Sequence, residues 1–119
     1  MIARTWHGSA TLAKADAYRS HFITKVVPHL KDIAGHQGAY LLQREVDGRV
    51  EFLAVTLWDS IETIKTFSGP DPGRATIEPE GRAALLSFDE YARNYEVAYS
   101  TDYGTVEKCR VAENAHVPR

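Results

Sequence analysis

The sequence lacks the features that mark secreted, membrane-spanning and cysteine-rich metal-binding proteins. It has one cysteine, Cys109, so no disulfide can form within the chain and no metal site can be built from several cysteines. Its longest apolar run is much shorter than a membrane span, and its first residues do not show the basic-then-apolar pattern of a signal sequence. We therefore expect a cytoplasmic protein with no membrane association.

An excess of charge of one sign is also missing. The chain has 14 lysines and arginines against 16 aspartates and glutamates, which gives a net charge of −2, and no basic patch stands out. This balance gives no reason to expect a nucleic-acid partner. With 119 residues, the chain is long enough for one domain with a hydrophobic core. We expect that domain over residues 1–99 and a tail over residues 100–119, which either frays or lies across a partner subunit.

Two apolar runs around a tight turn predict a β-hairpin. The runs cover residues 38–42 and 52–58 and do not alternate with polar residues, which is typical of strands that are buried on both faces. Between them lie Asp47 and Gly48, residue types that tolerate the positive φ of a type I′ turn. Helices from the rest of the chain can cover one face of such a sheet. We predict that the other face meets a second copy of the protein.

Helical periodicity follows a predicted first strand over residues 2–8. Ser9 or Thr11 can cap the helix, Pro28 is expected to kink it or to break it in two, and Gly35 ends it. Its apolar stripe recurs every three or four residues and consists of Ala15, Tyr18, Phe22, Val26, Leu30 and Ile33. One face of this helix is therefore expected to pack on the sheet.

The elements after the hairpin complete the pattern. A short helix follows Asp59, which together with Glu62 resembles a capping box. A further helical turn is expected from Glu78 to about Leu86, and a last strand with alternating polarity begins at Phe88. The order β-α-β-β-α-β predicts an α+β protein of the ferredoxin-like class, with an antiparallel sheet and its helices on one face.

A family resemblance extends over about residues 1–99. It rests on four segments, which read MIARTW at 1–6, AKADAY at 13–18, FLAVTLWDSIE at 52–62 and NYEV at 94–97. They resemble the antibiotic biosynthesis monooxygenase family, whose members adopt a dimeric α+β barrel of two ferredoxin-like units packed sheet to sheet. The resemblance implies a homodimer formed through the sheet face. It also implies a small aromatic ligand and, as in the members that oxygenate phenols and quinols with molecular oxygen, no cofactor.

Cofactor-free oxygenation needs an apolar pocket, a group that takes a proton from the substrate, and donors that stabilise the resulting anion. In the fold of the family, this pocket lies between the helices and the sheet. We assign Tyr18 and Tyr40 as hydrogen-bond donors and Trp58 and Phe67 as walls. The full set of predicted substrate-binding residues is Thr5, Tyr18, Phe22, Tyr40, Trp58 and Phe67.

His21 and His7 are the two imidazoles that can serve as the general base. His21 comes three residues after Tyr18 and shares a helix face with it. Each histidine also has a structural interpretation. His21 can sit at the rim of the apolar stripe with its ring in solvent, and His7 can donate to a loop carbonyl. The histidine spacing contains no metal-ligand motif, so we expect no metal.

Three functions stay open at this level. The leading interpretation is a cofactor-independent monooxygenase that acts on an aromatic or quinol-type small molecule. The second is a dimer that binds a small molecule without reacting, for instance a stress-response protein. Haem binding or degradation comes third, because Thr5 stands where the haem-degrading branch has an asparagine and no histidine lies between His36 and His116 to serve as the axial ligand.

Overall fold

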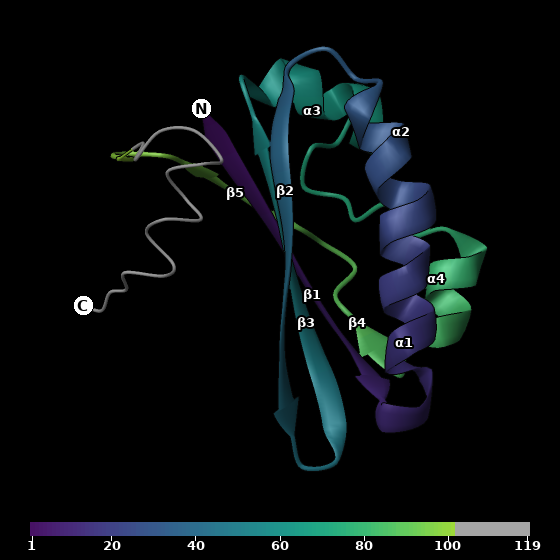
Figure 1. The fold of residues 1–119 in the computed structure, drawn as a ribbon. Coiled ribbons are helices and arrows are strands. Elements are labelled where there is room, and N and C mark those ends of the chain that lie inside the picture. The colour runs from purple at the N-terminus through teal and green to yellow at the C-terminus, as the bar shows by residue number, and fades with distance from the viewer. Residues whose placement is uncertain (102–119) are drawn as a thin grey trace, which may run out of the picture.

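The described part of the chain, residues 1–101 of a computed structural model, forms a five-stranded antiparallel sheet with its helices on one side (Figure 1). In chain order the elements are β1 (Ile2–Thr11), α1 (Leu12–His21), the π-helical segment η1 (Phe22–Val26), α2 (Val27–Lys31), β2 (His36–Val46), β3 (Arg49–Trp58), α3 (Ile61–Ser68), α4 (Pro79–Ala84), β4 (Ser87–Phe88) and β5 (Arg93–Glu96). The strand order is β2-β3-β1-β4, and β5 also pairs with β1. The predicted ferredoxin-like fold is confirmed. The predicted tail with Cys109 lies, from residue 102 onward, outside the described residues.

The hairpin of β2 and β3 forms as the two apolar runs predicted. Asp47 has a φ of 53° and Gly48 a φ of 76°, which are the positive values that a type I′ turn requires at its two central residues. The turn joins Val46 directly to its partner Arg49 and fixes the register of the pair. β3 then pairs with β1 along its whole length, from Arg49 opposite Thr11 to Trp58 opposite Ile2. The middle of the sheet is therefore held by two long antiparallel ladders.

The first helix starts at Thr11, whose hydroxyl accepts a hydrogen bond from the backbone N–H of Lys14 at 3.3 Å. The prediction for Pro28 was a kink or a break. The helical region is divided into α1 and α2 by five residues ahead of the proline that adopt π-helical hydrogen bonding, and helix α2 follows them directly (Figure 1). Proline has no N–H to donate and its ring crowds the carbonyl four residues earlier, and a π-helical turn shifts the hydrogen-bond register just before it. The apolar stripe therefore stays on the sheet across the irregularity.

Gly35 ends the helical region with a φ of 96°. Its carbonyl accepts a hydrogen bond from the N–H of Asp59 at 2.9 Å, so the turn before β2 contacts the start of α3. Ser60, and not Asp59 as predicted, caps α3: its Oγ accepts from the N–H of Thr63 at 3.2 Å. The Asp59 carboxylate instead accepts from the Thr63 hydroxyl at 2.5 Å.

Replacing Gly35 with alanine is expected to destabilise the protein strongly. A Cβ at this position would lie 2.6 Å from Thr63 Cγ2 and 2.7 Å from Asp59 Oδ1, in addition to the backbone strain of a positive φ. Left-handed backbone costs about 1–2 kcal/mol and overpacking about 1–3 kcal/mol, so the free energy of unfolding should fall by about 2–5 kcal/mol. Urea unfolding of Gly35→Ala measures this loss. Gly48→Ala is the matched control, because it has a positive φ but no atom within 4 Å, and it should lose only the backbone part.

The predicted last strand is interrupted in its middle. β4 and β5 both pair with β1, but residues 89–92 between them turn toward the loop that follows α3. The N–H of Ala75 donates to the carbonyl of Glu90 at 2.9 Å, and the N–H of Ala92 donates to the carbonyl of Gly73 at 2.8 Å. Between β4 and β5 the chain therefore pairs with this loop and not with β1. The loop lies far away in the sequence, so the alternation of polar and apolar residues could not predict this pairing.

The two faces of the sheet differ. The inner face, toward the helices, buries Phe52 and Trp58 completely, whereas Leu53 between them is 37% exposed on the outer face. Strand pairing arranges the outer face in three rows, Leu42–Leu53–His7, Tyr40–Val55–Thr5–Arg93 and Gly38–Leu57–Ala3–Tyr95. Within residues 1–101 no helix covers this largely apolar surface (Figure 1). Residues 1–101 thus bury one face of the sheet and leave the other face uncovered by any helix.

Candidate functional site

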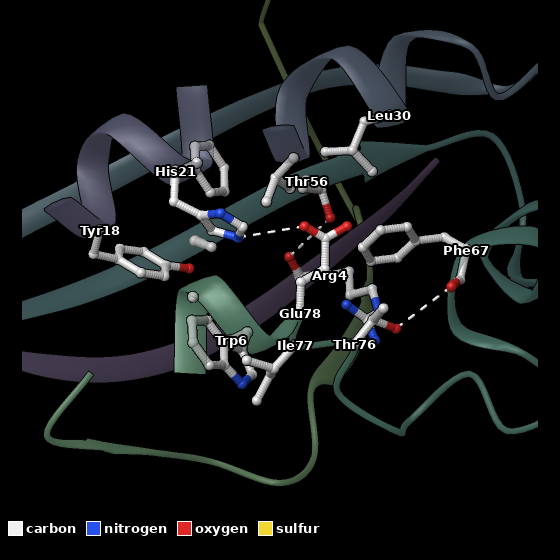
Figure 2. A pocket seen from close by; sticks show the side chains of 14 residues that line it. Arg4, Trp6, Tyr18, His21, Leu30, Thr56, Phe67, Thr76, Ile77 and Glu78 are labelled. Atoms are coloured by element: carbon white, nitrogen blue, oxygen red, sulfur yellow. Dashed lines mark hydrogen bonds and ion pairs between the residues drawn. The ribbon is translucent and has the colours of Figure 1, made fainter. Parts of the chain in front are cut away.

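A pocket lies between the first helix, the inner face of the sheet and the segment that leads into α4 (Figure 2). Its lining comes from six parts of the chain: Arg4 and Trp6 of β1; Tyr18, His21, Phe22, Val26 and Leu30 of the first helical region; Ala54 and Thr56 of β3; Phe67 of α3; Thr76, Ile77 and Glu78 of the loop; and Gly81 of α4. Four predicted site residues, Tyr18, His21, Phe22 and Phe67, meet here. The pocket is where the sequence interpretation expected one, between helices and sheet.

Aromatic rings form much of the wall. The Tyr18 ring lies 6.2 Å from the ring of Trp6 and 6.5 Å from that of Phe22, centroid to centroid. The free space enclosed is small, about 50 Å³. A cavity of about 150 Å³ holds a benzene molecule, so an aromatic ligand enters only if part of the wall moves. Residues 76–78, at the end of the irregular segment 69–78, form the part of the wall that has no helix or regular strand structure.

Tyr18 is buried, and burial raises the pKa of its phenol to about 12. Its hydroxyl therefore keeps its proton throughout the neutral range and can donate a hydrogen bond. Figure 2 shows the hydroxyl directed into the pocket. Tyr18 is thus placed to donate to an oxygen atom of a bound molecule.

His21 is also buried, and its ring lies 6.1 Å from that of Tyr18. Two carboxylates flank the imidazole: Glu78 Oε1 lies 3.6 Å from Nε2, and Glu80 Oε1 lies 3.7 Å from Nδ1. Both distances exceed those of a hydrogen bond, and Nδ1 has no hydrogen-bond partner among the described residues. The imidazole therefore lines the pocket between two carboxylates and makes no hydrogen bond through Nδ1 to the described residues.

Gly81 explains how α4 can reach this histidine. A Cβ on Gly81 would lie 3.0 Å from both Cδ2 and Nε2 of His21. The absence of a side chain lets the backbone of α4 press against the imidazole and brings the two neighbouring glutamates to its edges. Sequence reasoning missed Gly81 and Glu78, because nothing local in the sequence connects this short helix with a residue almost sixty positions earlier.

Trp58 does not line the pocket. It is fully buried beside it, with its ring 6.0 Å from that of Phe67, and its indole N–H donates to the hydroxyl of Thr56 at 2.8 Å. Trp58 therefore does not touch the pocket itself and can influence a ligand only by fixing the positions of Phe67 and Thr56.

Thr5, His7 and Tyr40 lie on the outer face of the sheet and are separated from the pocket by the sheet itself. His7 is half-exposed, with Nε2 4.0 Å from Glu51 Oε1, and Tyr40 is exposed. The reason is strand alternation: the sequence interpretation put Thr5 and His7 on the pocket side, whereas β1 turns Arg4 and Trp6 inward. Any ligand role of these three residues belongs to a different surface.

Arg4 is the functional candidate that sequence reasoning missed. It is only 5% exposed, and Nη2 donates to the carbonyl of Arg74 at 2.6 Å, while the guanidinium lies 5.5 Å from the ring centre of Phe67. Burial lowers the pKa of Arg4 to about 10, and Nε has no partner among the described residues. The sequence offered one indication that Arg4 faces the pocket. Residues two positions apart on a strand share a face, and the large apolar residue Trp6 marks the inner one.

His21, Glu78 and Glu80 are also the described residues whose ligand atoms come within 4.8 Å of one another, close enough to share a metal ion. The two carboxylates face different nitrogens of the ring, so they flank the imidazole more than they converge on one nitrogen. The expectation of no metal stays a prediction. A haem macrocycle is far larger than the space of about 50 Å³ and would require a larger displacement of the wall than a single aromatic ring does.

Comparisons with known proteins give fold neighbours only. No family model matches the sequence, and no curated protein matches it. Among solved structures, a protein from Bacillus cereus named a "putative antibiotic biosynthesis monooxygenase" is similar, with a TM-score of 0.60 and 16% identity over 85% of this chain and 96% of its own. A protein of the same name from Deinococcus radiodurans has a TM-score of 0.55 and 16% identity over 88% of this chain and 100% of its own.

A third structure of that name, from Chloroflexus aurantiacus, has a TM-score of 0.50 and 16% identity over 87% of this chain and 98% of its own. The predicted resemblance is therefore confirmed for the fold: the chain has the α+β fold of these monooxygenase-like structures.

In residues 1–101 no helix is long and apolar enough to cross a bilayer.

Proposed function

We propose that the protein is a cofactor-independent monooxygenase that oxidises an aromatic or quinol-type molecule in the pocket between helices and sheet. The observation that carries the proposal is the meeting of a buried proton acceptor, His21, with a buried hydrogen-bond donor, Tyr18, in a pocket with aromatic walls. The names of the structural neighbours support the same activity. The cytoplasm is the compartment proposed for it.

His21 takes a proton from a ring hydroxyl of the substrate, and Tyr18 donates a hydrogen bond to the oxyanion that forms. The electron-rich anion then passes an electron to molecular oxygen, and the two radicals combine at a ring carbon. Loss of water from this peroxide leaves a carbonyl group. One oxygen atom enters the ring and the other leaves as water, and the substrate supplies all the electrons, so no external reductant is needed. Phe22 and Phe67 hold the ring by their apolar faces.

Substrate entry requires displacement of residues 76–78. Residues 72–75 are held by hydrogen bonds: the carbonyl of Arg74 accepts from Arg4, the N–H of Ala75 donates to Glu90, and the carbonyls of Pro72 and Gly73 accept from Asn94 and Ala92. The hydroxyl of Thr76, by contrast, donates to the carbonyl of Phe67 at a long 3.4 Å, and Thr76 and Ile77 make no backbone hydrogen bond with the described residues. Segments with so few hydrogen bonds open at low free-energy cost, and loops of this kind often control access to a site.

The protein acts as a homodimer in this proposal, with the two outer faces packed against each other. The three apolar rows of that face support it, because large exposed apolar patches on a sheet are typical of interfaces. Such an interface should bury more than about 1,000 Å² in total. The resulting pair of sheets corresponds to the barrel that the family resemblance implies.

Oxygen consumption tests the proposed activity. The purified protein, treated with a chelator to remove metals, is incubated with quinols and anthrone-like phenols in an oxygen electrode, and products are identified by mass spectrometry. The expected result is uptake of one oxygen molecule per product, with one ¹⁸O atom retained from ¹⁸O₂. Binding of these compounds without oxygen uptake would contradict the enzyme proposal and favour the non-catalytic binding protein.

A further inference from the structure

Arg4 carries a charge that nothing in the described chain neutralises. Among residues 1–101, no carboxylate lies within 4.0 Å of its guanidinium, and its one hydrogen bond is to the backbone carbonyl of Arg74. A guanidinium has five N–H donors, and here Nε is buried without any acceptor. A buried charge without a counter-ion is strongly unfavourable. Such an arrangement is expected where a ligand supplies the missing anion.

The position of Arg4 points to the pocket as the place of that anion. The residue lies on the inner face of β1, opposite Thr56, and lines the pocket beside Phe67 (Figure 2). The acidic residue that lines the pocket, Glu78, lies next to His21, with Oε1 3.6 Å from Nε2. The pocket therefore has a positive group beside Phe67 and a negative group beside His21.

We propose that Arg4 binds the carboxylate of an aromatic acid, so that the ligand of this pocket is a ring with a carboxylate at one end and a hydroxyl at the other. The proposal rests on the function proposed above and names its substrate class. The planar guanidinium matches a carboxylate with two parallel hydrogen bonds, and one arginine balances its single negative charge. Phe67 and Leu30 leave the site apolar around this pair.

The charge distribution also orients the ligand. The carboxylate pairs with Arg4 and is repelled by Glu78, so the hydroxyl at the opposite end of the ring points toward His21. In this orientation the group that loses its proton lies beside the proton acceptor. Arg4 would therefore select the substrate and align it for the reaction.

The test compares two ligands that differ only in charge and carry a hydroxyl opposite the carboxyl carbon, 3,4-dihydroxybenzoate and its uncharged isostere 3,4-dihydroxybenzamide. Binding is measured without oxygen, by quenching of tryptophan fluorescence, since Trp6 lines the pocket. The wild-type protein should bind the acid about 10- to 100-fold more tightly than the amide, the usual strength of a hydrogen-bonded charge pair. Equal affinities, or no binding of either compound, would overturn the proposal.

Variants assign the selectivity to Arg4. Arg4→Met should abolish the preference for the acid while the amide binds unchanged, and Glu78→Gln should strengthen binding of the acid. Arg49→Met is the matched control, because Arg49 is exposed at the hairpin and should leave both affinities unchanged. Retention of the acid preference in Arg4→Met would overturn the assignment. The wild-type comparison needs no variant, so it decides the matter even if a variant fails to fold.

The same ligands separate this proposal from the proposed activity. If the acid binds selectively but no oxygen is consumed, the carboxylate site stands and the monooxygenase proposal fails. If neutral quinols are oxidised and the acid is not preferred, the activity stands and the carboxylate site fails.

Discussion

Replacing His21 with alanine should lower the rate of the proposed oxygen consumption about 10²- to 10⁴-fold, the usual contribution of a general base. The loss appears in kcat, because the imidazole acts on the proton and does not hold the ring. The variant keeps its fold and its mass in solution, since His21 lies in the pocket and far from the outer face. Steady-state oxygen uptake and scattering mass on the same preparation measure both quantities.

Two further measurements make this result specific. Added imidazole should restore part of the activity of His21→Ala, because the substitution leaves a space of matching shape between Tyr18 and Gly81. His7→Ala, the other histidine proposed from the sequence, should keep its activity because His7 lies on the outer face. Full activity of His21→Ala would refute the assigned role, and loss of activity in His7→Ala alone would transfer it to the outer face.

Replacing Leu53 with glutamate is expected to convert the proposed dimer into a monomer. Leu53 lies in the outer-face row between Leu42 and His7, and the two-fold symmetry of a dimer places the new charge in the interface twice. A buried charge without a partner costs about 3–5 kcal/mol, which is enough to raise the dissociation constant by several orders of magnitude. Light scattering at micromolar concentration should give a mass near 13.3 kDa for the variant and twice that value for the wild type.

The control for this experiment is Ile23→Glu. Ile23 is an apolar residue that is 62% exposed on the helical side of the molecule, so a charge there should leave the dimer intact. A wild-type protein that is already monomeric at micromolar concentration would contradict the proposed interface. Dissociation by both substitutions would show that the interface involves the helices instead.

The fold could be predicted from the sequence because the sequence patterns that indicate its elements are local. The Asp47-Gly48 turn, the helical stripe and the alternating strands each depend on residues a few positions apart. What escaped prediction depends on distant pairing. The last strand looked continuous, yet its centre pairs with the loop at residues 73–75. Similarly, the π-helical segment ahead of Pro28 is one of several ways in which a helix can accommodate a proline.

Part of the site could be predicted from the sequence for the same reason. Tyr18, His21 and Phe22 follow from the helical stripe, and Phe67 from the second helix. The strand residues were assigned to the wrong side because β1 carries polar and apolar side chains on both faces. The inner pair combines the charge of Arg4 with the apolar ring of Trp6, so Trp6 alone indicated the inner side and the charge of Arg4 argued against it. The face on which each β1 side chain lies is set by the pairing of β1 with β3. In β3 the fully buried Phe52 and Trp58 mark the inner face.

Strand β1 contributes to both faces of the sheet. Its even-numbered residues Arg4 and Trp6 line the pocket, while its odd-numbered residues Thr5 and His7 lie on the outer face that we propose as the dimer interface. A shift of the β1–β3 register by one position would exchange the two sets, placing an arginine in the proposed interface and a histidine in the pocket. The proposed dimer and the proposed ligand selectivity therefore both depend on this one register.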